Sequence, residues 1–379
     1  MPDRFNRLRE FMDEAIEKSG FPGIDCIIYQ DHKEIFRHAS GYMDLENKIP
    51  PVAWALYNIY SATKMVTCVA ALQLVEQGRM LLTDPLHKYL PEYEHMQVKY
   101  GTFTIAPTRN KIRIADLFAM TAGLSYESGT PHLKKLNEDT KGDYTTREFA
   151  AALAKEPLLF EPGEGWNYGF CHDVLAAVIE EISGKTFGQY LQDNIFAPLG
   201  MKDACFYVPD GKKDRIAPQY SYDKVNKVSN LIANTCLAAS PGGRFESGGG
   251  GLVMPAEDYI LFIDALACGG VGKTGAKIIS PPSIALMGKN QLRGKAMEDY
   301  RKGGALEGHG YSLGSGVVYD GAAGLSFRPE GSFSWGGIGG VQNLVDPKNR
   351  LSYYVSQHLI AGSERVLGAY MINILYGLL

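Results

Sequence analysis

Cysteine is scarce in this sequence of 379 residues, and the six cysteines that occur are scattered along it. They show neither a C-x-x-C pair nor a Cys/His spacing typical of metal ligands. We therefore expect free thiols in a reducing cytoplasm. The eight histidines show no ligand spacing either, so the sequence predicts neither a metal nor an organic cofactor.

Long apolar runs are also missing. The longest candidate, residues 366–379, falls short of the ~20 residues that a membrane-spanning helix needs. Residues 1–20 are charged throughout and contain no apolar core of the kind found in signal peptides. Neither sign of charge prevails, because 38 Lys and Arg residues are set against 42 Asp and Glu residues. We therefore expect a cytoplasmic protein that binds neither membranes nor nucleic acid.

Hydrophobic residues make up 45% of the chain and charged residues 21%, a balance typical of a large folded core. Strand patterns lie near both ends, at residues 24–30 and 351–360, and helical patterns such as Asp173–Ser183 fill the middle. Strands at both ends with helices between them predict an α+β fold. We expect one antiparallel sheet flanked by helices, with a mostly helical subdomain inserted.

We expect a single domain of residues 1–379. Its sheet subdomain would take approximately residues 1–60 plus 300–379, and its helical subdomain approximately residues 61–299. Because ligand sites commonly form where two such bodies meet, we expect the functional site in the cleft between them.

Two short motifs resemble functional loops but lack the context that those loops need. Residues 267–274 approach a phosphate-binding loop, yet the segment before them is predicted to be a helix, where a strand is required. Gly310–Gly314 fits the G-x-S-x-G pattern of a nucleophile elbow, yet no helix is predicted after it. We interpret the first as non-functional and the second as a glycine-rich strand.

The spacing S-x-x-K occurs twice, and the two copies differ in context. Ser221–Lys224 lies in a polar stretch and is predicted to be a solvated loop. Ser61–Lys64 opens a mostly apolar helix, where positions three apart share one face, so Lys64 would stand beside the Ser61 hydroxyl. Burial would then lower the pKa of Lys64 and leave a neutral amine that accepts a proton. A helix-capping serine with a lysine that reaches the surface is the alternative, and the helix alone leaves both open.

Two further segments bear on the choice. Residues 160–170 are rich in turn formers and run into a helix, which places Tyr168 on a stiff loop. Residues 333–340 put glycines where a strand begins, so that backbone can approach a ligand closely. Tyr168 as a packing residue and the glycines as a bulge are the alternative interpretations.

These three sites, in this order and spacing, resemble the serine β-lactamase and penicillin-binding superfamily, above all its class C-like branch, which includes the family VIII carboxylesterases. The resemblance covers roughly residues 20–375. It is carried by residues 60–93, 114–126, 160–191, 248–266 and 335–347.

The resemblance implies roles for particular residues. Ser61 is the nucleophile and Lys64 its base or proton partner, and Tyr168 matches the tyrosine of the Y-x-N element, which shares the proton transfer. The backbone N–H groups of Ser61 and Ile338 would form the oxyanion hole. The chain is then a single β-lactamase-like catalytic domain.

The sequence also departs from the β-lactamase pattern. Phe170 stands where the asparagine of Y-x-N belongs, and Trp335-Gly336-Gly337 falls where β-lactamases have K-T-G. Without that lysine and asparagine, an apolar acyl or alcohol group is favoured over a substrate carboxylate. Because related esterases have a cleft-facing tyrosine in the corresponding loop, Tyr126 is placed with these residues as a substrate-binding residue.

The sequence thus predicts a serine hydrolase that cleaves short neutral carboxylic esters through a covalent acyl-enzyme on Ser61. The partner is a small-molecule ester, and no residue pattern points to a particular oligomeric state. One alternative is a β-lactamase or D-amino-acid peptidase of the same fold. Another is a non-catalytic homologue that binds a ligand.

Overall fold

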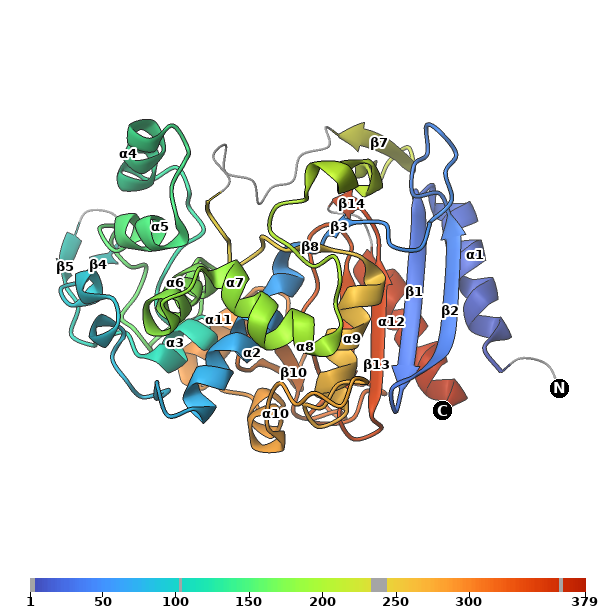
Figure 1. The fold of residues 1–379 in the computed structure, drawn as a ribbon. Helices are drawn as coiled ribbons and strands as arrows, with labels where there is room; N and C mark the ends of the chain where they lie inside the picture. Colours follow the sequence, from blue (N-terminus) through green and yellow to red (C-terminus); the bar gives the residue numbers. More distant parts are fainter. Residues whose placement is uncertain (1–3, 102–103, 233–243, 361–363) are drawn as a thin grey trace.

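Both ends of the chain contribute strands to one seven-stranded antiparallel sheet, in the order β2–β1–β13–β12–β11–β10–β9 (Figure 1). The computed structural model describes residues 4–101, 104–232, 244–360 and 364–379. The strands of this sheet are β1 (Gly23–Gln30), β2 (Lys33–Gly41), β9 (His309–Tyr311), β10 (Gly316–Val318), β11 (Phe333–Ser334), β12 (Gln342–Asp346) and β13 (Leu351–Ser356). The predicted α+β class is confirmed, while the division into two subdomains stays a prediction.

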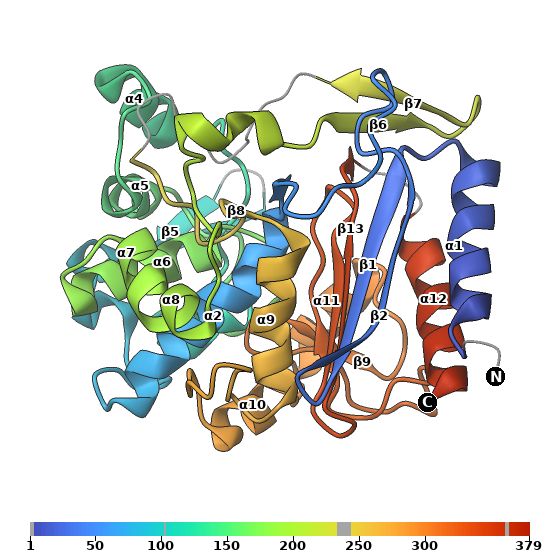
Figure 2. The ribbon, with the colours of Figure 1, turned by 45° about the vertical axis from the view of Figure 1, so that its right-hand side comes forward.

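Helices cover both faces of this sheet (Figure 2). α1 (Asn6–Ser19) and α12 (Glu364–Leu378) pack on one face, and α9 (Ala256–Ala267) packs on the other. Side chains alternate along β1 accordingly: Cys26 and Ile28 join the core under α1 and α12, and Ile27 joins the core around α9. Because both faces are covered, β1 and β13 are apolar over most of their length.

Among the remaining helices, α2 is central: it is buried from Thr63 to Leu74 and packs against α6 and α7. A 3₁₀ turn, Tyr60–Ala62, leads directly into α2. The helices are α2 (Thr63–Glu76), α3 (Ile114–Phe118), α4 (Pro131–Thr140), α5 (Thr146–Leu153), α6 (Cys171–Ser183), α7 (Phe187–Leu191), α8 (Ala197–Leu199), α10 (Pro281–Met287) and α11 (Gly294–Lys302). Among the described helices, none has the length and apolar character needed to cross a membrane.

Short strands complete the fold. β3 pairs with β8, β4 pairs with β5, and β14 pairs with β6, which in turn pairs with β7. Their bounds are β3 (Tyr57–Asn58), β4 (Gln97–Tyr100), β5 (Thr104–Pro107), β6 (Gln219–Asp223), β7 (Val228–Ile232), β8 (Val253–Met254) and β14 (Leu359–Ile360). The pairing of β3 with β8 joins the segment before Ser61 to the segment after a run of four glycines.

Three local predictions are corrected or refined by the structure. Ser221 lies on strand β6 and not in a loop, because β6 pairs on both sides with β7 and β14. Gly310–Gly314 is not one strand but the first half of a hairpin, since Gly314 has φ 87° and turns the chain against α2. The segment before residue 267 is helix α9, as predicted, so the phosphate-loop pattern lacks its strand.

Candidate active site

Ser61 lies in the 3₁₀ turn that precedes α2, and the backbone around it is tightly constrained. Tyr60, just before it, has φ 46°, a left-handed value that is uncommon for a residue with a large side chain. The Tyr60 hydroxyl donates a hydrogen bond to Gln219 Oε1 at 2.5 Å. A Cβ built on Gly337 or Gly339 would come within 2.3 Å or 2.7 Å of the backbone or ring of residues 59–60. Such packing holds a strained residue in place beside the serine.

Lys64 is completely buried one turn further on, so the surface-reaching alternative is wrong. Its Nζ donates to Ser61 Oγ at 3.2 Å, to Tyr126 Oη at 2.7 Å and to the Gly249 carbonyl oxygen at 2.5 Å. It also lies 4.6 Å from the centre of the Tyr168 ring. The ammonium group therefore connects the serine hydroxyl to two tyrosines.

The pKa of Lys64 departs from the sequence-based expectation. Burial alone lowers it, but Tyr168 and Tyr126 outweigh burial and raise the pKa above its usual value. The predicted neutral amine is therefore wrong for the resting protein, in which Lys64 carries its proton. A buried ammonium stabilises negative charge that develops on an oxygen beside it.

Tyr168 and Trp335 meet across the site. Trp335 Nε1 donates to Tyr168 Oη at 2.9 Å, and their ring centres are 5.4 Å apart. Asn343 on β12 fixes the Trp335 backbone, accepting from its N–H at 3.0 Å and donating to its carbonyl at 2.6 Å. Because indole has one N–H donor, the hydrogen bond to Tyr168 uses it, and the rest of Trp335 offers apolar ring surface.

Tyr126 and Phe170 extend this aromatic group. The Tyr126 ring meets Tyr168 edge-on at 5.3 Å and Phe170 edge-on at 4.7 Å. Phe170 also packs against Phe149 at 5.0 Å, and its backbone N–H donates to the Ser125 carbonyl. The structure thus brings Tyr126, Phe170 and Trp335 together around the Ser61–Lys64 pair, whereas their contact with substrate stays a prediction.

Glycines at 336 and 337 allow a close backbone approach. A Cβ on Gly337 would lie 2.3 Å from the Ile59 carbonyl oxygen, and one on Gly336 would lie 2.5 Å from the Val341 carbonyl oxygen. Side chains are therefore excluded at both positions. This contact brings the chain around Ile338 to the segment that holds Ser61, while the oxyanion hole formed by the two N–H groups stays a prediction.

A buried carboxylate, Asp173, supports the site and was missed in the sequence. Its Oδ1 accepts from Ser247 Oγ at 2.5 Å and from the Gly249 N–H at 3.1 Å. Gly249 in turn accepts the hydrogen bond from Lys64. Burial raises the pKa of Asp173. Its position in the first turn of α6 gave no signal, because acidic residues are favoured there in any helix.

A family model described as Beta-lactamase matches residues 8–377, and the chain belongs to this family. Family and fold together define a β-lactamase-fold hydrolase or acyltransferase, and the resemblance inferred from the sequence is confirmed.

Two curated relatives and one solved structure illustrate the family. Protein Rv1367c of Mycobacterium tuberculosis is 29% identical over 361 residues, covering 93% of this chain and 88% of the relative. Esterase EstB of Burkholderia gladioli is 26% identical over 362 residues, covering 90% and 86%. The structure of EstCE1, described as a hydrolase with promiscuous acyltransferase activity, superposes with a TM-score of 0.83 at 25% identity and 99% coverage of both chains.

Proposed function

We propose that the protein is a serine hydrolase that cleaves short neutral carboxylic esters through an acyl-enzyme on Ser61. The observation that carries this proposal is the fully buried Lys64, whose Nζ contacts both Ser61 Oγ and Tyr126 Oη. A buried cation needs compensating partners, and here those partners are the serine and tyrosine oxygens.

The reaction has two steps, acylation of Ser61 and hydrolysis of the acyl-enzyme. Ser61 Oγ attacks the ester carbonyl carbon while its proton passes to the Tyr168–Lys64 pair. The backbone N–H groups of Ser61 and Ile338 stabilise the oxyanion, and its collapse breaks the bond to the alcohol oxygen. The alcohol leaves with the transferred proton. Water then repeats the sequence on the acyl-enzyme and releases the acid.

Tyr168 is the proton acceptor in this scheme, because Lys64 is already charged. In this scheme Tyr168 reacts as a tyrosinate, which becomes a neutral phenol when it takes the serine proton, and two groups stabilise its negative charge before that transfer. Trp335 Nε1–H donates to Tyr168 Oη, and the Lys64 ammonium lies beside the same ring. Lys64 thus acts mainly through its charge, and its hydrogen bond to the Gly249 carbonyl keeps it in place.

The substrate class follows from the aromatic surfaces. Covering apolar substrate against Trp335 and Phe170 gains roughly 25 cal/mol per Å². A substrate carboxylate at Trp335 would find no lysine side chain there, and burying it unpaired costs free energy. Neutral esters are therefore preferred to β-lactams that carry a carboxylate. EstB, a relative over most of the chain, bears the name of an esterase.

A paired assay tests the proposal. The unmodified protein should hydrolyse p-nitrophenyl butyrate with a higher kcat/KM than nitrocefin. The double variant Trp335→Lys with Phe170→Asn should shift the ratio of the two toward nitrocefin. A higher kcat/KM for nitrocefin in the unmodified protein would show that it is a β-lactamase instead. Failure of a fluorophosphonate probe to label Ser61 would favour a non-catalytic binding protein.

Acyl transfer to an alcohol is a second candidate, favoured by the described activity of EstCE1. Both reactions share the acyl-enzyme and differ in the nucleophile that releases it. Adding 1-butanol to the butyrate assay should divert acyl groups to butyl butyrate if an alcohol can enter. Butyric acid as the sole product at high alcohol concentration would exclude transfer to this acceptor.

A further inference from the structure

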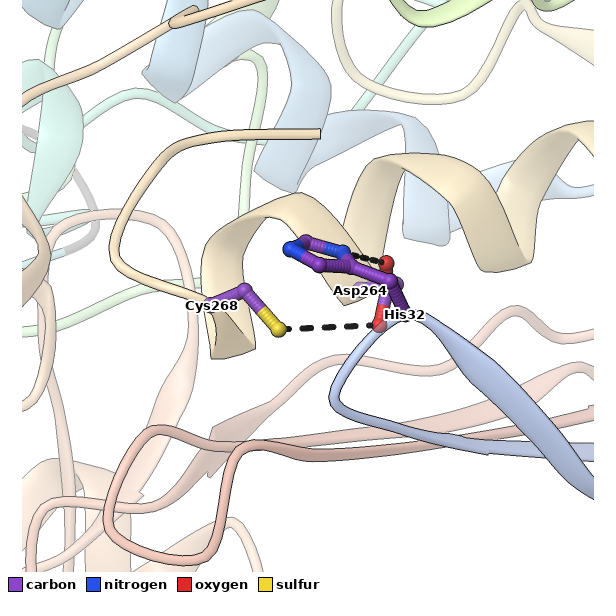
Figure 3. A group of neighbouring side chains, drawn as sticks. All are labelled: His32, Asp264 and Cys268. Atoms are coloured by element: carbon purple, nitrogen blue, oxygen red, sulfur yellow. Dashed lines mark hydrogen bonds and ion pairs between the residues drawn. The ribbon is translucent and has the colours of Figure 1, made fainter. Parts of the chain in front are cut away.

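A second group of chemically reactive side chains lies away from Ser61, at the edge of the main sheet (Figure 3). His32 is at the tip of the β1–β2 hairpin, where residues 31–32 both have positive φ. Asp264 is in the last turn of α9, and Cys268 follows directly after that helix. Because they are four residues apart, Asp264 and Cys268 lie on the same face at the end of α9. The hairpin tip that carries His32 lies against this face.

The three side chains converge on one small volume. His32 Nδ1 lies 2.7 Å from Asp264 Oδ2, and Cys268 Sγ lies 3.7 Å from Asp264 Oδ1. One donor atom of each lies within 4.8 Å of the others, and this is the one such group of three or more His, Cys, Asp or Glu residues in the described ranges. Asp264 is fully buried and Cys268 is 5% exposed. The His32 side chain is 27% exposed, which leaves one side open to solvent.

We propose that His32, Asp264 and Cys268 form a binding site for Zn²⁺, separate from the hydrolase site. Imidazole nitrogen, carboxylate oxygen and thiolate sulfur are the three ligand types that zinc takes in proteins. An ionised Asp264, a Cys268 thiolate and a neutral His32 together carry two negative charges, which match those of a divalent cation. The open side leaves the fourth position to water.

The geometry needs a small adjustment to hold the ion. Around a tetrahedral ion with bonds of ~2.0–2.3 Å, neighbouring donor atoms lie ~3.3–3.8 Å apart. The sulfur of Cys268 is already at this distance from Asp264 Oδ1, whereas His32 Nδ1, which faces the other carboxylate oxygen, Oδ2, must move outward by about half an ångström. His32 has the freedom to do so, since it is partly exposed at a hairpin tip.

Binding must remove hydrogen from two donor atoms: the Cys268 sulfur, and His32 Nδ1, which donates to the ionised Asp264 Oδ2 at 2.7 Å. Burial and the Asp264 carboxylate raise the pKa of Cys268 to about 11, so the thiol stays protonated until a cation binds. Binding then forms the metal–sulfur bond and releases the thiol proton to solvent, while the His32 proton moves through solvent from Nδ1 to Nε2, so that the imidazole stays neutral. Arg350, a cation close to Cys268, is paired with Asp31 and so is already partly neutralised.

The site would fasten the hairpin tip to the end of α9 without touching the hydrolase residues. Contact between α9 and the serine segment is made earlier in the helix, where the Tyr259 hydroxyl donates to the Ala62 carbonyl. Zinc bound to the folded chain should therefore raise the melting temperature by mass action. Ester hydrolysis should be unchanged.

Cobalt(II) serves as a spectroscopic probe on the full-length, chelator-treated protein. We expect one equivalent to produce a near-ultraviolet thiolate-to-cobalt charge-transfer band that added Zn²⁺ abolishes. Cys268→Ser should remove the band, and His32→Gln should weaken cobalt affinity at least tenfold. Matched controls are Cys205→Ser, at a partly buried cysteine outside the cluster, and His95→Gln, at an exposed histidine.

The outcomes separate the proposal from a purely hydrogen-bonded cluster. Loss of the band in Cys268→Ser, its retention in both controls, and a zinc-dependent rise in melting temperature only where the band forms would support the site. No band in the unmodified protein, or a band that survives Cys268→Ser, would overturn it. Hydrolysis of p-nitrophenyl butyrate, measured in parallel, reports separately on the Ser61 site.

Discussion

Two segments of this chain carry the same S-x-x-K spacing in different backbone conformations. Ser61–Lys64 runs from a 3₁₀ turn into α2, where residues three apart lie on one face. Ser221–Lys224 starts on strand β6 and ends at its turn, and strand side chains alternate between faces. In the first segment Lys64 Nζ donates to Ser61 Oγ, whereas Ser221 Oγ donates to the Asn230 carbonyl across the hairpin.

Burial separates the two copies further. Lys64 is completely buried among tyrosine oxygens and a carbonyl, whereas Lys224 is exposed. Removing water strengthens each electrostatic interaction around Lys64, while solvent screens the charge of Lys224. The comparison shows that the spacing acquires chemistry only when a helix aligns the two side chains and burial excludes water.

The largest effect is expected for the two serines. Ser61→Ala should lower kcat for p-nitrophenyl butyrate by at least ~10⁴-fold, because no acyl-enzyme can form without the nucleophile. Ser221→Ala is the matched control and should leave kcat within twofold, a change of under about 0.4 kcal/mol in the barrier. Mass spectrometry of the acylated protein checks the assignment. A butyryl group on any other residue in the unmodified protein would refute it.

The next largest effect on kcat is expected for Lys64, with Lys224 as its matched control. Lys64→Met keeps the length of the side chain but removes its charge, so kcat should fall by ~10²–10⁴-fold, as for Tyr168→Phe. Because Lys64 and Tyr168 act as one unit, the double variant should lose less than the product of the single losses. Lys224→Met should be silent. Fully multiplicative losses in the double variant would mean that the two residues act independently.

A buried histidine beside the Lys64 helix should make the free energy of unfolding depend on pH. His172 packs against Cys68 of α2, and burial followed by the charge of Lys64 lowers its pKa to about 3. Since the folded pKa lies below the unfolded value near 6.5, protonation favours unfolding. The stability is present above that value and is lost as pH falls.

Urea unfolding at pH 7 and pH 5 measures this loss. The His172 contribution should fall by about 2 kcal/mol over that range and be absent in His172→Gln. His95→Gln, at an exposed position, is the control and should keep the pH dependence of the unmodified protein. Identical pH dependence in His172→Gln and the unmodified protein would show that His172 titrates normally.

The smallest effect is expected for the hydrogen bond between Trp335 and Tyr168, beside the buried Ser61–Lys64 pair. Trp335→Phe keeps a ring but removes the N–H that meets Tyr168 Oη, so kcat should fall about tenfold. In a Tyr168→Phe background the same change should have almost no effect, because the acceptor is gone. Equal losses in both backgrounds would mean that Trp335 acts on the substrate alone.

Much of the active centre was predictable because its signals are local. The apolar pattern after Ser61 predicted a buried helix with Ser61 and Lys64 on one face, and the family resemblance then favoured their pairing. The Phe170 and Trp335 substitutions are visible in the sequence itself. The order of strands at both ends and helices between them was predictable for the same reason, because each pattern is formed by residues close together in the sequence.

The sequence by itself therefore determined the fold class, the family and the pairing of Ser61 with Lys64. Only the tertiary structure decided which distant groups meet them: Trp335 reaches Tyr168 across 167 positions, and Asp173 holds Gly249 across 76. The pKa of Lys64 is raised by Tyr168 and Tyr126, which come from distant segments, and this is why reasoning from burial alone predicted the wrong direction. Hydrogen bonds between remote segments, and the pKa shifts that they cause, depend on how those segments pack. The spacing of residues along the chain does not predict that packing.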